Sequence, residues 1–209
     1  GPRLRSYRSY RARNYRVMDP HLALILGGVR SGKSEYAESL ARDLNRPILY
    51  LATGRSTDAE MEQRIRRHRE RRPARWSTLE EPLDLAGELN NIQSASHQPP
   101  AVLIDSLDTW VSNMLLEHKV EGNQAEKLTL AALDSLLEIQ LHWPESWFLV
   151  SSEVGLSPVP PNVLGRRFQD LLGLVNQRVA VAAGRVCLVV AGIPVEIKGS
   201  GLTAKGLCP

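Results

Sequence analysis

Short apolar runs alternate with longer amphipathic segments along most of the chain. Short continuous apolar runs are typical of buried strands, whereas apolar positions that repeat every three or four residues indicate helices. We predict strands at residues 22–26, 48–52, 101–104, 147–151, 186–191 and 195–198. We predict helices at residues 35–44, 58–72, 108–118, 124–141 and 163–183. Strands that alternate with helices in this way form a mostly parallel sheet with helices on both faces.

The first predicted strand leads directly into a glycine-rich segment, GGVRSGKS, at residues 27–34. Its spacing fits the phosphate-binding loop pattern G-x-x-x-x-G-K-[ST], in which backbone N–H groups surround phosphate oxygens. Lys33 would add a positive charge and Ser34 a hydroxyl ligand for Mg²⁺. The helix that follows would point the positive end of its dipole at the phosphates. A chance glycine turn is an unsatisfactory explanation, because the strand and helix that the motif requires are both present. We therefore predict that the chain binds a nucleoside triphosphate.

This order of strand, glycine turn and helix predicts an α/β fold of the P-loop NTPase class, RecA-like, in a single domain. We expect that domain to span residues 21–209 and to bind ligands beyond the carboxyl ends of its strands. Residues 1–20 would precede it as a basic, disordered extension. With 209 residues, 43% of them hydrophobic and 23% charged, the chain has the composition of one ordinary globular domain.

The expected extension is rich in arginine and tyrosine, at Arg3, Arg5, Tyr7, Arg8, Tyr10, Arg11, Arg13, Tyr15 and Arg16. Arginines between aromatic residues can bind RNA or an anionic membrane surface. The segment has few apolar residues to bury, however, and this favours a disordered tail. The net charge of +3 is also too small to indicate a nucleic-acid partner.

The length of the apolar runs and the number of cysteines indicate the cellular compartment. No apolar run approaches the roughly 20 residues that a membrane-spanning helix needs. The two cysteines, Cys187 and Cys208, lie in separate parts of the sequence, and a disulfide framework is not expected from them. We expect a cytoplasmic protein without stable membrane insertion.

Asp105 follows the apolar run at residues 101–104. A carboxylate at the carboxyl end of a buried strand is the expected partner of Mg²⁺ in a protein with a phosphate-binding loop. The same residue could instead cap the next helix, because aspartate is a strong N-cap residue. The metal role is favoured, since bound triphosphate brings Mg²⁺ to this region.

A second unusual segment, RIRRHRERR, occupies residues 64–72. On a helix, Arg64, Arg71 and Arg72 would share a face with His68. Their positive charge would lower the pKa of His68 and keep its ring neutral, and a neutral imidazole is a nucleophile. The alternative is a basic helix exposed to solvent, which composition alone would favour.

Several segments together resemble one enzyme family. They are GGVRSGKS (27–34), LYLATG (49–54), DAEMEQRIRRHRERRPARW (58–76), LIDSLDTWVSNML (103–115), SSEVGLSPVPPNVLGRRFQDLLGLVNQRVA (151–180) and VVAGIPVEIK (189–198). In this order they closely resemble the bifunctional adenosylcobinamide kinase/adenosylcobinamide-phosphate guanylyltransferase family of cobalamin biosynthesis. The resemblance covers residues 22–198.

The resemblance implies roles for individual residues. It implies that His68 becomes covalently guanylylated and that Lys33 takes part in catalysis. It implies nucleotide contacts at Gly27, Gly28, Val29, Arg30, Ser31, Gly32, Lys33, Ser34, Ala52, Thr53, Gly54, Arg69, Glu70, Arg71, Arg72, Glu80 and Asp105. GTP, ATP and Mg²⁺ would be the nucleotides and metal, with Ser34 and Asp105 as metal ligands. The substrates would be adenosylcobinamide and its phosphate, and the assembly a homotrimer with active sites near subunit interfaces.

The chain departs from the family pattern at four positions. Arg67 stands where many relatives have a second histidine, Ser152 replaces a common asparagine, Pro194 replaces a frequent glycine, and Asp105 replaces a glutamate. None of these changes removes a group that the mechanism requires. Two alternatives stay open: an enzyme that retains one of the two activities, and a nucleotide-dependent nucleic-acid-binding protein. The second predicts salt-sensitive oligonucleotide binding without covalent GMP.

Overall fold

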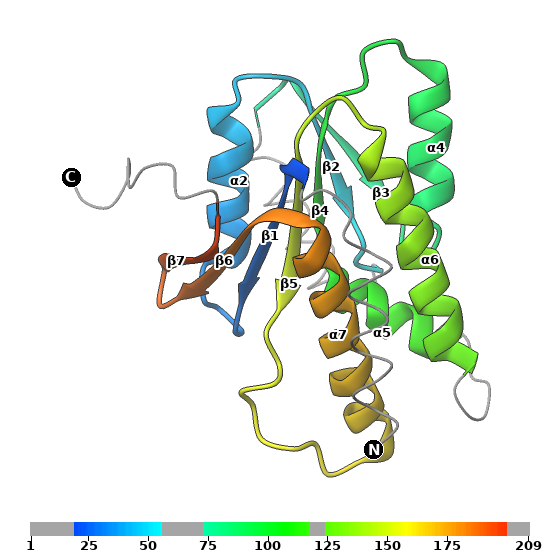
Figure 1. Ribbon diagram of the computed structural model, residues 1–209, viewed down its shortest axis with the longest axis vertical. Coiled ribbons are helices and arrows are strands. Elements are labelled where there is room, and N and C mark those ends of the chain that lie inside the picture. The colour runs from blue at the N-terminus through cyan, green and yellow to red at the C-terminus, as the bar shows by residue number, and fades with distance from the viewer. Residues whose placement is uncertain (1–18, 56–72, 118–123, 200–209) are drawn as a thin grey trace.

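The computed structural model describes residues 19–55, 73–117 and 124–199 (Figure 1). The strands in these ranges are β1 (Asp19–Gly27), β2 (Ile48–Ala52), β3 (Trp76–Glu80), β4 (Ala101–Asp105), β5 (Trp147–Ser152), β6 (Ala183–Val190) and β7 (Ile193–Lys198). The helices are α2 (Lys33–Asp43), α4 (Leu85–Ala95), α5 (Leu107–Glu117), α6 (Gln124–Leu141) and α7 (Val163–Ala182). Within the described residues, none of these helices is long and apolar enough to cross a membrane.

The strands form one sheet in the order β3-β2-β4-β5-β1-β6-β7. All neighbouring pairs are parallel except β6 and β7, which form an antiparallel hairpin at one edge. The predicted mostly parallel sheet is therefore confirmed. Because β1 lies between β5 and β6, its carboxyl end is flanked by strands on both sides.

The two faces of the sheet pack against different helices (Figure 1). One face has Ile25, Ile48 and Leu103, which pack with Ala37 and Ala41 of α2. The opposite face forms a larger core with α4, α5, α6 and α7. Strands β1, β2, β4 and β5 are therefore buried from both sides over most of their length, and this explains why their sequences are apolar runs without alternation.

The structure also differs from the sequence-based prediction. β3 and α4 were not predicted, and the helix predicted at residues 58–72 lies outside the described residues. α7 and β6 follow one another without a loop, since Ala183 has extended dihedral angles directly after the last helical turn. The boundary predicted near residue 186 is therefore three residues too late.

Candidate functional site

The phosphate-binding loop joins the carboxyl end of β1 to the first residue of α2. Gly27 is in register with Ser152 of β5 and Val189 of β6, so the loop begins in the middle of the sheet. Gly32 precedes α2 with a φ of 90°, a left-handed conformation that glycine adopts without a steric penalty. Among the residues that the structure describes, no side chain caps this helix, and its first N–H groups can therefore donate to an anion.

Hydrogen bonds from the loop and its neighbours fix its shape. The Ser31 N–H donates to the Gly28 carbonyl at 3.3 Å, and the Gly192 N–H donates to the Ser31 carbonyl at 2.8 Å. The Lys33 ammonium donates to the Gly28 carbonyl at 3.1 Å, which places its charge over the loop. Within the described residues the Ser31 hydroxyl is buried without a hydrogen-bond partner. A phosphate oxygen would satisfy this group, because buried polar atoms normally have partners.

Asp105 connects the loop helix to the sheet. Its Oδ1 accepts a hydrogen bond from the Ser34 hydroxyl at 3.3 Å, and its Oδ2 accepts one from the Tyr50 hydroxyl at 2.7 Å. These contacts direct the carboxylate toward α2 and β2. Ser34 and Asp105 thus present two neighbouring oxygen ligands, the type that Mg²⁺ prefers beside substrate phosphates.

Burial raises the pKa of Asp105 above its usual value. The hydrogen bonds from Tyr50 and Ser34 and the positive charge of Lys33 oppose this rise, whereas the negative charge of Asp108 adds to it. Ionisation of Asp105 is therefore costly in the protein alone. A bound cation would reverse this balance, because it favours the carboxylate.

Glu80 and Ala52 extend this edge of the site. Ala52 is in register with Glu80 on one side and with Asp105 on the other. Trp76 packs into the core beneath α2, and Glu80 lies four residues further along the same strand. Because side chains alternate along a strand, Glu80 projects to the face that α2 covers. The predicted residues Ala52, Glu80 and Asp105 therefore lie side by side at the carboxyl ends of β2, β3 and β4.

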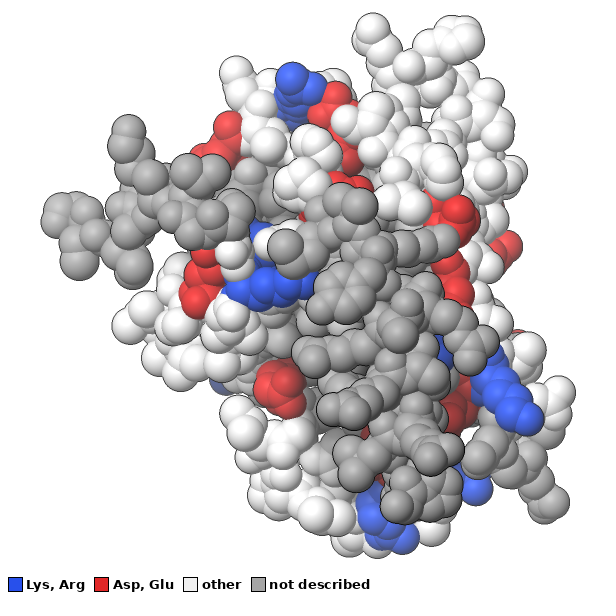
Figure 2. All heavy atoms as spheres, in the orientation of Figure 1, with Lys and Arg blue, Asp and Glu red and all other residues white. Residues whose placement is uncertain are grey.

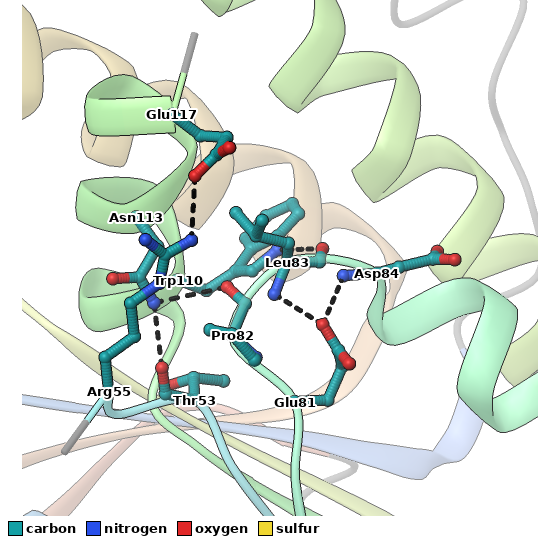
Figure 3. A network of polar contacts seen from close by, with 9 residues as sticks. All are labelled: Thr53, Arg55, Glu81, Pro82, Leu83, Asp84, Trp110, Asn113 and Glu117. Atoms are coloured by element: carbon teal, nitrogen blue, oxygen red, sulfur yellow. Dashed lines mark hydrogen bonds and ion pairs between the residues drawn. The ribbon is translucent and has the colours of Figure 1, made fainter.

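Thr53, which directly follows β2, is more deeply buried than Ala52 before it. It is fully buried; its Oγ1 accepts from the Ser106 N–H and donates to the Ser106 carbonyl, both at 2.8 Å. The Thr53 carbonyl accepts a 2.8 Å hydrogen bond from Asn113 of α5, whose amide also donates to Pro82 (Figure 3). The hydroxyl and the carbonyl of Thr53 are thus hydrogen-bonded within the protein interior. A nucleotide contact in this segment would use the adjoining Gly54.

The site includes polar residues that sequence reasoning did not single out. Asp108, in the first turn of α5, accepts a 2.8 Å hydrogen bond from the Ser152 hydroxyl. Asn176 of α7 accepts from the Ser151 hydroxyl at 2.7 Å and donates to the Ser152 carbonyl at 3.0 Å. Tyr50, the partner of Asp105, was also missed. Its sequence signal is a hydroxyl-bearing ring two residues before the end of an apolar strand.

The predicted residues His68, Arg69, Glu70, Arg71 and Arg72 lie outside the described residues. The described chain ends on one side at Arg55 and resumes at Pro73. Arg55 forms an exposed ion pair with Glu117 of α5, with 3.0 Å between Nη2 and Oε2 (Figure 3). The segment with the histidine therefore follows β2 and precedes β3 in the chain.

Residues 23–197 match a family model described as cobinamide kinase / cobinamide phosphate guanyltransferase. The chain is 42% identical over 179 residues to the bifunctional adenosylcobalamin biosynthesis protein CobP of Pseudomonas aeruginosa, covering 86% of this chain and 98% of that protein. It is 40% identical over 186 residues to CobU, the corresponding protein of Salmonella typhimurium, covering 85% and 99%. An ATPase from a type III secretion system of pathogenic bacteria has a similar fold, with a TM-score of 0.50, 10% identity, and 85% and 57% of the two chains covered.

Proposed function

Because this chain belongs to the cobinamide kinase / cobinamide phosphate guanyltransferase family, we propose that it catalyses both reactions of that description. It would phosphorylate adenosylcobinamide with ATP or GTP, and then transfer GMP from GTP to the phosphorylated product. The observation that most supports this proposal is the family match over residues 23–197 together with an intact phosphate-binding loop beside Asp105. Both reactions require a bound nucleoside triphosphate.

In the kinase reaction the aminopropanol hydroxyl of adenosylcobinamide attacks the γ-phosphorus, and the nucleoside diphosphate leaves. The N–H groups of residues 28–34 and the first turn of α2 would hold the β- and γ-phosphates. Lys33 would stabilise the negative charge that develops on the transferring group. Ser34 and Asp105 would hold Mg²⁺, which neutralises phosphate charge when bound.

In the guanylyl transfer, His68 attacks the α-phosphorus of GTP; pyrophosphate leaves and a nitrogen–phosphorus bond forms on the ring. The phosphate of adenosylcobinamide phosphate then attacks the same phosphorus. This step gives adenosylcobinamide-GDP and returns the histidine. A covalent intermediate divides one difficult displacement into two easier ones. Arg69, Arg71 and Arg72 would bind the triphosphate oxygens.

Labelling with α-³²P-GTP tests the histidine. We expect the wild-type protein to retain acid-labile, comparatively alkali-stable label and His68→Ala to retain none, while much of the kinase activity survives. The matched control is His142→Ala, because His142 is an exposed histidine between α6 and β5, at the end of the sheet where β5 begins. An unlabelled wild-type protein would exclude the covalent mechanism, and label that persists in His68→Ala would assign it to another residue.

The assembly is also part of the proposal. A homotrimer is implied by the family resemblance, and the exposed apolar residues Ile193, Val195 and Ile197 of the edge strand β7 are compatible with subunit contact. Sedimentation equilibrium should then give three times the 23.2 kDa mass of the chain. A monomer at enzyme-assay concentrations would contradict the proposed homotrimer but not the proposed reactions.

A further inference from the structure

The segment between β5 and α7 exposes apolar side chains. Leu156 is 85% exposed and Val159 is 75% exposed, and they are followed at the start of α7 by the exposed residues Val163 and Leu164. In Figure 2 the region of this segment is mostly white, with few charged groups. Large apolar residues gathered on one exposed segment indicate a binding surface more often than isolated ones do.

Hydrogen bonds within the segment and with α7 hold this surface in place. The Gln169 amide donates to the Val154 carbonyl at 2.6 Å, and Arg166 donates to the carbonyls of Pro160 and Pro161 at 3.1 and 2.8 Å. The Asn162 side chain accepts a 2.7 Å hydrogen bond from the Gly165 N–H and caps α7. Polar groups of the segment are thus satisfied internally, so binding of a ligand would require little further ordering.

The segment begins at the phosphate-binding loop. The Glu153 N–H donates to the Gly27 carbonyl at 3.2 Å, and Asn176 holds the adjoining Ser152. Leu156 is three residues beyond Glu153, so at most about 10 Å of extended chain separates their Cα atoms. In Figure 1 the segment lies at the end of the sheet where β1 and β5 end. The segment therefore starts beside the phosphate-binding loop, with Leu156 nearest to it along the chain, and continues from there to the start of α7.

We propose that Leu156, Val159, Val163 and Leu164 form the surface on which the corrin ring of the substrate rests during both reactions. This inference depends on the proposed function, because it takes the substrate from it. Adenosylcobinamide is a large macrocycle with methyl-bearing faces, and only the hydroxyl of its side arm has to reach the γ-phosphate. The ring must then lie outside the phosphate-binding loop but within the length of the arm. Contact between apolar surfaces there would contribute in proportion to the area removed from water.

Steady-state kinetics of the double variant Leu156→Ser/Val159→Ser test this surface. We expect the KM for adenosylcobinamide to rise about tenfold or more, as the loss of two apolar contacts predicts, whereas the KM for ATP stays within about twofold. Equilibrium dialysis with adenosylcobinamide alone should show the same loss of affinity. A role confined to folding would not separate the two KM values in this way.

The control is Leu141→Ser/Val181→Ser, which changes a leucine and a valine that are 38% and 47% exposed, near the C-terminal ends of α6 and α7. Covalent GMP labelling from GTP alone needs no corrinoid, and it reports whether the nucleotide site of each preparation is intact. An unchanged KM for adenosylcobinamide in a loop variant that still accepts GMP overturns this inference and leaves the proposed function standing. Loss of self-association in sedimentation, with that KM unchanged, would assign the surface to a second copy of the chain instead. A wild-type protein without either activity would refute the proposed function itself.

Discussion

Gly27 and Gly28 are neighbours in the phosphate-binding loop but differ in the space around them. A Cβ atom on Gly27 would overlap Ser31 Oγ and would lie 2.8 Å from the Val189 carbonyl oxygen. A Cβ atom on Gly28 would meet no atom within 4 Å. The first glycine is therefore required by close packing between β1, the loop and β6. The second is left free to approach a ligand.

We expect Gly27→Ala to lower the free energy of unfolding by about 1–3 kcal/mol, because the backbone oxygen of Val189 cannot move away cheaply. Gly28→Ala should change stability by less than about 0.5 kcal/mol. Urea unfolding of both variants without nucleotide measures the difference. Equal stabilities of the two variants would show that the contacts around Gly27 do not restrain the loop.

Asp105 gives a prediction about pH. Its raised pKa means that the folded protein holds the proton more tightly than the unfolded chain does. Its contribution to stability therefore falls as the pH rises from the usual carboxyl range up to the raised pKa. Asparagine can accept from Tyr50 and donate to Ser34 without ionising. In protein without metal or nucleotide, Asp105→Asn should raise the melting temperature more at about pH 8 than at about pH 5.

Calorimetry at the two pH values checks this expectation, and Asp170→Asn on the exposed surface of α7 is the control. The same Asp105 variant should bind GTP with Mg²⁺ less tightly, because a carboxylate ligand is lost. If Asp105→Asn raised the melting temperature as much at about pH 5 as at about pH 8, the cost of ionising Asp105 could not be the cause of the gain.

At the scale of elements, one buried amide joins three parts of the site. Asn113 of α5 donates to Thr53 after β2 and to Pro82 after β3, and Trp110 of the same helix donates to the Leu83 carbonyl at 2.9 Å (Figure 3). These bonds fix the ends of β2 and β3 relative to α5. They also fix the point where the chain leaves the sheet toward the segment with His68.

Asn113→Ala should destabilise the protein by about 2–4 kcal/mol, since two buried carbonyl groups lose their donor. Asn113→Asp should be at least as destabilising at neutral pH, although its shape is conserved, because a carboxylate cannot donate to these carbonyls. Asn91→Ala on the exposed surface of α4 is the control. Urea titrations compare the three variants, and wild-type stability of Asn113→Asp would exclude a structural role for the amide.

The elements differ in how well their sequences predict them. β1, the glycine loop and α2 were predicted because the motif is local and each part has its own signal. β3 was missed because it has five residues and buries little beyond Trp76. α4 had usable signals, since Asp84 caps it through the Gly87 N–H and Leu85 and Leu89 share its buried face. The contacts of Tyr50 with Asp105 and of Asn113 with Thr53 depend on strand order and register, which local patterns do not determine.

At the scale of the whole molecule, the phosphate-binding loop and Asp105 lie at the carboxyl ends of the strands, and nucleotide binding there should stabilise the entire domain. GTP at a hundred times its Kd would add about 2.7 kcal/mol, a rise of about 5–10 °C in melting temperature for a chain of this size. Lys33→Ala should lose most of this rise and impair both half-reactions. Lys198→Ala, a change in the edge strand β7, should retain it.

Thermal scans with and without GTP and Mg²⁺ measure these shifts. A full GTP-dependent rise in Lys33→Ala would show that the triphosphate binds elsewhere, and a loss of the rise in Lys198→Ala would show that any destabilising lysine substitution has the same effect.

The order of the strands has a consequence during synthesis. β1 is made first, but its neighbours in the sheet are β5 and β6, from the last third of the chain. At about 5–20 residues per second, a ribosome needs roughly 10–30 s to proceed from Gly27 to Val189. During that interval an apolar strand has emerged without its pairing partners. A nascent chain should therefore gain the ability to retain GTP only after β5 and β6 have been made and have left the ribosome.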